Sequence, residues 1–564
     1  MSNKEAIRKL LSLLTGYKKQ IAFIMFFMVL STGLNMCMPL FSRSIMDDGF
    51  IGGNQPLLIL LSVSSAAIFI VNTLIKVFNE KYRIDISAKI EFSLLEQAFL
   101  HLTRMKADYF SRTNNAEIMN IIYTDIGNIT MISDRVMFYI VSQIFSITGG
   151  VIGLLLIDYR LTILVLLFVP FKYIVMKYFA KLHKKIMDEY INDAQEYAGW
   201  FGDTVGGISE IKLFNIAKHK YKEFCEKQNV VIDKKKKMEW IGEWNNSTDS
   251  ILIQILTTIL YIVGANLVFS LEVSIGSIFA FITYSSYVTA PISSILNIGY
   301  MFSGVIPSTI RYYEFMDIEE EDLDHKKDAI PVFGDLALKD ISFSYEPEKP
   351  VLEHLNINFS AKSKTALIGK NGSGKSTILG LITRMYQPDQ GNVSLDGQDI
   401  AGFSLVDYRN LIAVVSQQVY LFNDSIRNNI CLYKNIDDKE LDQVLVDSSL
   451  KEFVDEVTLD YMVGNDGTLL SGGQKQKIAL ARALLHNKPI VIFDEATSNA
   501  DVYSEERILG LLHTKLKDKT VIIISHKKVI LSVVDQIVFL NEGTSTTGSY
   551  DSLYTVLNEA GITI

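Results

Sequence analysis

The first half of the chain consists of long apolar stretches separated by charged segments. Five stretches carry no charged residue, namely 21–42, 49–75, 136–157, 250–271 and 273–310. A sixth begins at Leu161 and is interrupted by Lys172 and Lys177. A helix of about 20 apolar residues, rising 1.5 Å per residue, crosses the roughly 30 Å hydrocarbon core of a bilayer. The pattern therefore predicts six membrane-spanning helices before residue 310.

The charged segments predict how these helices are oriented. The first twenty residues and the segment 181–248, which includes four consecutive lysines at 234–237, are rich in Lys, whereas the connections near Asp158 and Glu272 are very short. Because basic loops stay in the cytoplasm, we expect the N-terminus and the two long segments 79–134 and 181–248 to be cytoplasmic. Both long segments lack Gly/Pro-rich stretches, so we expect helical extensions of the spans.

Lys172 is an ionisable residue within the apolar stretch that begins at Leu161, which is the fourth stretch in chain order. Such residues are costly in a bilayer and often belong to a functional site. Two interpretations stay open: the lysine reaches out to the inner headgroups, or it faces a central cavity and attracts an anionic part of the cargo. In the second case the sixth helix would line the same cavity with Thr283, Tyr284, Tyr287 and Asn297.

The periodicity changes after a charge-dense stretch at residues 319–327. Apolar runs at 365–368, 412–415 and 490–493 alternate with helical segments, which is typical of an α/β domain with a mostly parallel sheet. We therefore predict a multi-pass helical membrane domain over residues 1–324 and an α/β domain over 325–564, which the glycine-rich loop GKNGSGKST at residues 369–377 identifies as a P-loop NTPase domain.

A glycine-rich loop, GKNGSGKST at residues 369–377, follows the apolar run TALI and precedes a helical segment. This is the phosphate-loop pattern in the strand–loop–helix context that it requires. Backbone N–H groups and the helix N-terminus would bind the phosphates of ATP, Lys375 would reach the β- and γ-phosphates, and the Ser376 hydroxyl would bind Mg²⁺. The predicted nucleotide-binding residues of this loop are Gly369, Asn371, Gly372, Ser373, Gly374, Lys375, Ser376 and Thr377.

Two further sites complete the predicted chemistry. Asp494 and Glu495 end the apolar strand PIVIFDE, where the first acid suits Mg²⁺ and the second can act as the general base toward water. The sequence LSGGQ, in which Ser471, Gly472, Gly473 and Gln474 open a periodic helix, is a second phosphate-type helix start. The simplest use of two such starts is ATP held between two copies of the chain.

These motifs, in this order, resemble those of an ATP-binding-cassette (ABC) exporter half-transporter, and the resemblance covers nearly the whole chain. It implies that Tyr345 stacks on adenine and that Gln417 contacts Mg²⁺ and water. It also implies that His526 is the switch histidine, that residues 498–501 form the D-loop, and that coupling segments lie near 105–110 and 206–214. The predicted catalytic residues are Glu495, His526 and Gln417, and the predicted Mg²⁺ contacts are Ser376, Gln417 and Asp494.

The sequence departs from the family pattern at a few positions. The D-loop reads SNAD where SALD is usual, and Asn465 stands where many exporters have Glu. None of these changes removes a catalytic group, so a homodimer is favoured and a heterodimer stays possible.

The resemblance implies an ATPase that exports an amphipathic peptide, drug or lipid by alternating access across a bacterial plasma membrane. An ATP-gated channel or sensor on the same fold is the alternative, and a non-transporting ABC ATPase is disfavoured by the six spans. The formal net charge of −9 argues against a nucleic-acid partner.

Overall fold

The computed structural model describes residues 1–113, 115–132, 137–323, 333–346, 349–495, 502–541 and 543–553. The chain divides into two compact units. The first contains Met1–Leu102 and Asn114–Ile318, and the second contains Thr103–Thr113 and Glu319–Ile564. The predicted boundary between residues 324 and 325 lies outside the described residues.

The first unit is helical. Among the residues that the structure describes, six helices are long and apolar enough to cross a membrane, which confirms the predicted number of spans. These are α2 (Lys18–Ser44), α3 (Gln55–Arg104), α7 (Met137–Ile157), α8 (Tyr159–Gly206), α10 (Ala217–Phe269) and α11 (Ile275–Met316). Its shorter helices are α1 (Asn3–Leu13), α5 (Asn115–Asn120), α6 (Ile126–Met131) and α9 (Ile208–Leu213). The short helix α4 (Ala107–Arg112) lies in the segment Thr103–Thr113 of the second unit.

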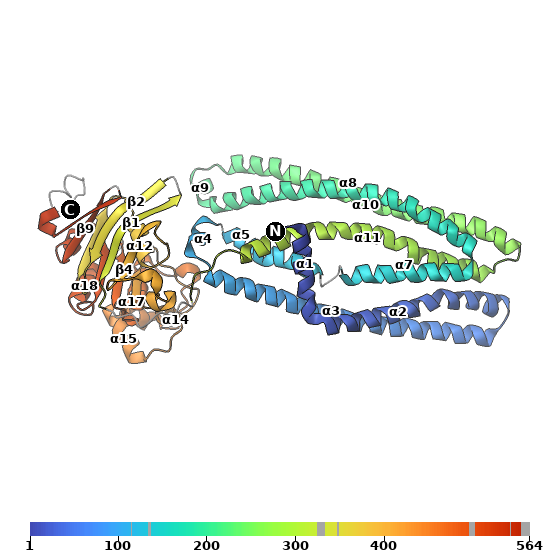
Figure 1. The fold of residues 1–564 in the computed structure, drawn as a ribbon, viewed down its shortest axis with the longest axis horizontal. Helices are drawn as coiled ribbons and strands as arrows, with labels where there is room; N and C mark the ends of the chain where they lie inside the picture. Colours follow the sequence, from blue (N-terminus) through green and yellow to red (C-terminus); the bar gives the residue numbers. More distant parts are fainter. Residues whose placement is uncertain are drawn as a thin grey trace. The chain divides into compact units, whose positions relative to one another are not determined.

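The long charged segments extend the spanning helices, as predicted. Helices α8 and α10 run side by side as one long hairpin closed by α9 (Figure 1). In the charged segment 181–248, ion pairs join the two helices of this hairpin. They include Lys234 with Glu189 at 2.5 Å and Lys227 with Glu196 at 2.9 Å.

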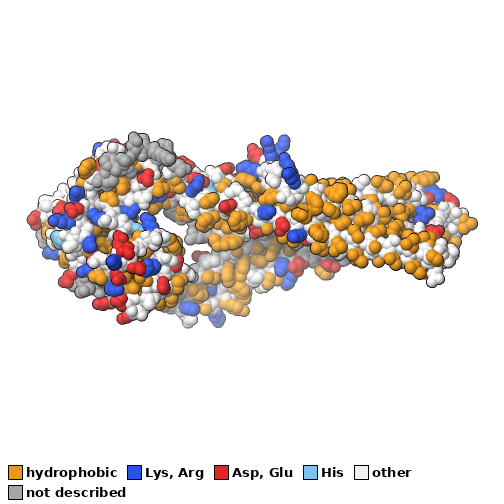
Figure 2. Space-filling view, turned by 90° about the horizontal axis from the view of Figure 1, so that it is seen from below, with side chains coloured by type: hydrophobic (Ala, Val, Ile, Leu, Met, Phe, Trp, Pro, Cys, Tyr) orange, Lys and Arg blue, Asp and Glu red, His pale blue; other side chains and the backbone are white. Residues whose placement is uncertain are grey.

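Hydrophobic side chains cover much of the helical surface, as Figure 2 shows. Fully exposed apolar residues are expected where lipid is the solvent, and Phe69, Leu156 and Leu167 are each more than 60% exposed. Inside the bundle, α7, α8, α10 and α11 share a core that includes Leu154, Val165, Leu256 and Phe281.

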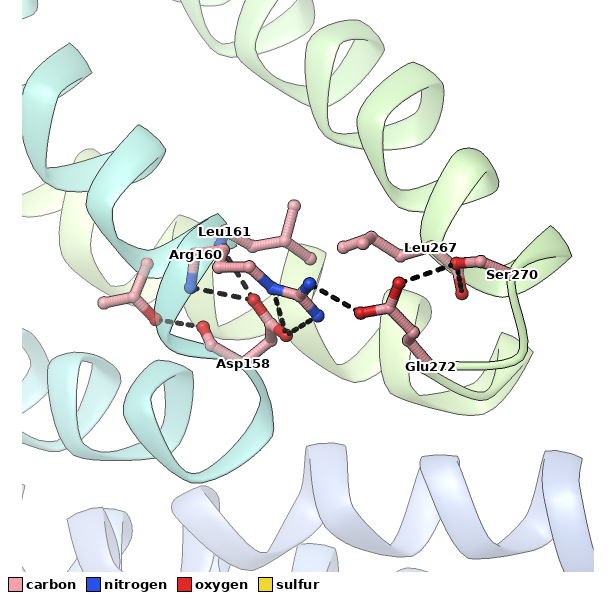
Figure 3. A network of polar contacts seen from close by, with 7 residues as sticks. Asp158, Arg160, Leu161, Leu267, Ser270 and Glu272 are labelled. Carbon is pink, nitrogen blue, oxygen red and sulfur yellow. Dashed lines mark hydrogen bonds and ion pairs between the residues drawn. The ribbon is translucent and has the colours of Figure 1, made fainter.

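A polar network joins the ends of two helical hairpins, where α7 leads to α8 and α10 leads to α11 (Figure 3). Asp158 is the N-cap of α8, because its Oδ1 accepts hydrogen bonds from the backbone N–H groups of Arg160 and Leu161 at 2.8 and 3.0 Å. The Arg160 guanidinium bridges Asp158 to Glu272. Burial opposes ionisation of Asp158, but these hydrogen bonds outweigh it, so the pKa of Asp158 is lowered.

The second unit contains two sheets. The four-stranded sheet has the order β2-β1-β4-β5 and is antiparallel. The six-stranded sheet has the order β10-β9-β3-β8-β7-β6 and is parallel except for the β9–β10 pair, as the sequence predicted. The strands are β1 (Leu336–Glu346), β2 (Lys349–Phe359), β3 (Lys364–Gly369), β4 (Gln390–Leu395), β5 (Gln398–Asp399), β6 (Ile412–Val415), β7 (Ile490–Asp494), β8 (Thr520–Ile524), β9 (Gln536–Asn541) and β10 (Thr544–Gly548).

The second unit also contains helices that follow or connect the strands. They are α12 (Lys375–Ile382), α13 (Leu405–Arg409), α14 (Ile426–Cys431), α15 (Asp438–Asp447), α16 (Lys451–Val457), α17 (Gly472–Leu485), α18 (Val502–His513) and α19 (Lys528–Leu531). One core lies between the two sheets and includes α12, and another packs α17 and α18 against β6, β7 and β8. A third core holds α14 to α17 together as a helical subdomain.

We expect Asp158→Ala to lower stability by about 1 kcal/mol, the usual cost of losing an N-cap. Thermal unfolding of the detergent-solubilised protein measures the change. Glu272→Gln is the matched control, since it removes an ion pair of two partly exposed groups but leaves the cap intact. Equal midpoints for Asp158→Ala and the native protein would contradict the assigned capping role.

Candidate nucleotide-binding and hydrolysis site

The loop between β3 and α12 has the backbone that a phosphate site needs. Gly372 and Gly374 adopt φ values of +84° and +96°, which side chains other than glycine rarely tolerate. A Cβ on Gly374 would lie 2.6 Å from Leu352 Cδ2, so the loop also needs glycine there for space. The strand–loop–helix context that the sequence predicted is therefore present.

Polar groups inside this loop are suited to an anionic ligand. The buried Lys375 Nζ donates hydrogen bonds to the carbonyl oxygens of Gly369 and Lys370 at 2.6 and 2.9 Å. Ser373 Oγ is buried and has no hydrogen-bond partner among the described residues. A buried donor without a partner costs free energy, so an oxygen of a phosphate would satisfy this hydroxyl.

Asp494 is the last residue of β7, which lies between β6 and β8, and Glu495 directly follows it. Glu495 has a φ of +48°, a strained conformation for a non-glycine residue, and its N–H is held by the carbonyl of Ile524 at 3.1 Å. Gln417, which follows β6, donates from Nε2 to Glu495 Oε2 at 2.6 Å. The structure thus joins two residues that the sequence assigned to the same chemistry.

The pKa values of three further predicted residues are shifted by burial and by charges of the same site. Burial and the neighbouring Glu495 raise the pKa of Asp494. Burial lowers the pKa of Lys375, against the attraction of Glu495 and Asp494. Burial and the charge of Lys375 lower the pKa of His526, which follows β8. The charges of Lys375, Asp494 and Glu495 therefore act on one another, and those of Lys375 and Glu495 also act on His526.

Tyr345 lies at the end of β1, beside the helix that the glycine-rich loop opens. Its hydroxyl is 3.1 Å from Thr377 Oγ1, and 37% of the residue is exposed. Its ring contacts the ring of Tyr386 edge to face, with 5.4 Å between the centroids. The position leaves an aromatic face beside the phosphate loop, and adenine stacking stays a prediction.

The second phosphate-type helix start is formed as the sequence suggested. Ser471 caps α17, and its side chain and that of Gln474 exchange hydrogen bonds with each other's backbone N–H groups at 3.2 and 2.8 Å. Gly472 and Gly473 form the first turn, and a Cβ built on either would meet no atom of the other described residues within 4 Å, the adjoining helix backbone aside. This helix start is therefore open on its glycine side. The predicted D-loop, residues 498–501, lies outside the described residues.

One ion pair close to this site could not be predicted from the sequence. Arg409 binds both carboxylate oxygens of Glu321 at 2.8 Å and donates to the carbonyls of Thr383 and Arg384 just after α12. Glu321 in turn donates its N–H to the carbonyl of Arg104, the last residue of α3. The end of the phosphate-loop helix is therefore bonded to the segment that follows α11.

In the helical unit, Lys172 matches neither sequence interpretation. Its side chain is fully buried, and its Nζ lies 2.7 Å from Asp249 Oδ1 and 2.9 Å from the carbonyl of Thr289. The lysine therefore neither extends to the headgroups nor faces a cavity. Tyr284 was also wrong as a cavity residue, because it is buried and its hydroxyl donates to the carbonyl of Met36.

Comparisons with known proteins agree with this architecture. The sequence model of the ABC transporter transmembrane region matches residues 21–292, and the ABC transporter model matches residues 352–498. The chain is 28% identical over 478 residues to an ATP-dependent lipid A-core flippase of Alcanivorax borkumensis, with 81% of this chain and 79% of the relative covered. It is 27% identical to an uncharacterised ABC transporter ATP-binding protein of Bacillus subtilis, with 98% and 92% covered.

A solved structure has the same fold. The structure of a bacterial Atm1-family ABC exporter with ATP bound matches with a TM-score of 0.84 at 21% identity, covering 96% of this chain and 98% of that one. The chain is thus a membrane protein with an ATPase domain coupled to transport. It belongs to the ABC transporter family and has the half-transporter arrangement of one membrane domain and one nucleotide-binding domain.

We expect Glu495→Gln to reduce ATP hydrolysis by roughly 10²-fold or more, as the loss of a general base does, while ATP binding persists. Phosphate release and the binding of a fluorescent ATP analogue measure the two effects. Glu452→Gln on α16 is the matched control, because it neutralises an exposed glutamate outside the site. Hydrolysis at the native rate by the Glu495 variant would refute its role as base.

Proposed function

We propose that two copies of this chain form an ATP-driven exporter that moves an amphipathic lipid from the inner leaflet of a bacterial plasma membrane. The main support for the proposal is the hydrogen bond between Gln417 and Glu495, the predicted general base. The same described chain also contains six helices that are long and apolar enough to span a membrane. A site for ATP hydrolysis in the same chain as a membrane-spanning bundle is suited to drive transport.

In this proposal each residue of the site has a defined task. Lys375 and the loop N–H groups hold the phosphates, and Ser373 supplies a further donor. Glu495 accepts a proton from the attacking water, Gln417 orients that carboxylate, and His526 contacts the γ-phosphate. Ser376, Gln417 and Asp494 would hold Mg²⁺, which stabilises the developing phosphate charge. Among the described residues no three His, Cys, Asp or Glu side chains cluster as metal ligands, in keeping with a metal held largely by the nucleotide.

The dimer is supported by the tip of the α8–α10 hairpin. Leu213 and Phe214, beside α9, are 76% and 71% exposed. The tip lies roughly 70 Å from the start of α8 by the helix rise, far more than the 30 Å of a bilayer core, so lipid cannot cover these side chains. We propose that the tip docks on a second copy, and that α4 and α9 are the coupling segments.

The choice of a lipid as cargo is supported by the relatives, of which several are named ATP-dependent lipid A-core flippases. The proposed topology places the N-terminus and the nucleotide-binding domain in the cytoplasm, because the lysine-rich segments lie on that side.

Reconstituted protein should move fluorescent phospholipids between leaflets when ATP is supplied. Dithionite quenching of labelled phosphatidylethanolamine and phosphatidylglycerol in proteoliposomes measures this movement, with Glu495→Gln as the inactive control. ATP hydrolysis without movement of any labelled lipid, together with uptake of a labelled peptide or drug, would replace the lipid with that cargo.

Mixing two inactive variants tests whether ATP is shared between copies. If each ATP lies between Lys375 of one copy and Ser471 of the other, dimers of Lys375→Ala with Ser471→Ala contain one intact site and one doubly altered site. We expect the mixture to hydrolyse ATP faster than either variant alone, as phosphate release would show. If tagged mixed dimers are purified and remain as inactive as the parents, independent shared sites are refuted.

A further inference from the structure

A buried charge pair connects three spanning helices in the helical unit. Lys172 on α8 contacts Asp249 on α10 at 2.7 Å, and it donates to the carbonyl of Thr289 on α11 at 2.9 Å. Asp249 Oδ1 also accepts a hydrogen bond from Ser293 Oγ on α11 at 2.5 Å. Lys172 has no exposed surface, and the Asp249 side chain is 21% exposed. The pair therefore makes two separate contacts with α11.

These two contacts lie on either side of a proline in α11. Thr289 precedes Pro291 by two residues, and Ser293 follows it by two. A proline has no N–H, so the carbonyl of Tyr287 loses its donor within the helix, and helices bend at such points. Ser146 Oγ on α7 donates to this carbonyl at 3.3 Å. Neighbouring helices thus supply contacts to α11 at a turn that a proline weakens.

Stability alone does not account for the pair. The cost of removing two charges from water offsets most of their attraction, so a buried ion pair contributes little net stability. The pair instead restricts the positions of its partners, because a buried lysine and a buried carboxylate need hydrogen-bonding groups at defined places around them. Here those partners include the backbone before Pro291 and a hydroxyl after it.

We propose that Lys172 and Asp249 are positioning residues for transport, which together set the bend of α11 at Pro291. Along the chain, α11 directly precedes the nucleotide-binding domain. A movement of that domain would therefore pass into the membrane domain through α11, and the bend at Pro291 would determine how the helix moves. The inference goes beyond the proposed function and does not depend on which cargo is carried.

The test measures the shape of α11 directly. Cysteines replace Phe279 and Ile295, two exposed residues on either side of Pro291 and roughly 24 Å apart along the helix. The native cysteines are first replaced by Cys37→Ser, Cys225→Ser and Cys431→Ala. Electron spin resonance then gives the distribution of distances between spin labels in nanodiscs, without nucleotide and after trapping with ATP and vanadate.

The main variant is Lys172→Met with Asp249→Asn, which removes both charges and leaves neither unpaired. We expect this double variant to hydrolyse ATP at the native basal rate, to broaden the distance distribution and to lose its nucleotide-dependent shift. Lys177→Met, which removes an exposed lysine from the same helix, should keep the native distribution. Distributions of the double variant that superimpose on those of the native protein would overturn the proposal.

Two single variants keep the test decisive if the double variant does not fold. Ser293→Ala removes only the contact beyond Pro291, and it should broaden the distribution in part; an unchanged distribution would overturn the proposal. Asp249→Asn leaves Lys172 unpaired. If that change instead raises the movement of labelled phosphatidylglycerol, Lys172 is an anion site and the positioning role fails. Failure of the native protein to move any lipid would reject the proposed cargo and leave the distance measurement valid.

Discussion

The absence of hydrogen-bonding solvent in the bilayer core governs the helical unit. Every polar group within a span must find its partner inside the protein, and the bundle contains several such pairs. Asn72 donates to Asn35 at 2.9 Å, Tyr284 donates to the carbonyl of Met36, and Lys172 contacts Asp249. Each pair joins different helices, so the same requirement that makes polar groups costly also determines which helices pack together and in which register.

The nucleotide site depends on a different constraint, the geometry of a parallel sheet. Strands β3, β8, β7 and β6 are neighbours and run in the same direction, so the loops at their carboxyl ends meet at one edge. The loop with Lys375, His526, the Asp494–Glu495 pair and Gln417 follow these four strands in that order. Residues that are widely separated in the sequence are thereby collected without long loops, and burial at this edge accounts for the altered pKa values of Asp494, Lys375 and His526.

Motifs with a local physical meaning could be predicted from the sequence. The six spans, the parallel sheet and the family are confirmed, because each depends on hydropathy, periodicity or a loop that is contiguous along the chain. Lys172 shows the limit of predictions that depend on local sequence patterns. The cost of Lys172 in the membrane could be predicted, but its partner Asp249 lies on another helix, between the charged segment 181–248 and the apolar stretch 250–271. The bidentate bond between Glu321 and Arg409 was missed for the same reason, since single charges in charge-rich segments carry no pairing information.

The Glu321–Arg409 pair helps to hold the segment after α11 in place, although this segment is short of apolar residues. Glu321 is only 12% exposed and is held through its side chain by Arg409 and through its N–H by Arg104. Lys106 adds an ion pair with Glu319 at 2.7 Å. Arg409 also holds the carbonyls after α12, the helix that begins at Lys375. A displacement of the phosphate loop would therefore reach the segments that continue into α3 and α11 through bonds within a single chain, because charge-assisted bidentate bonds resist both shear and rotation.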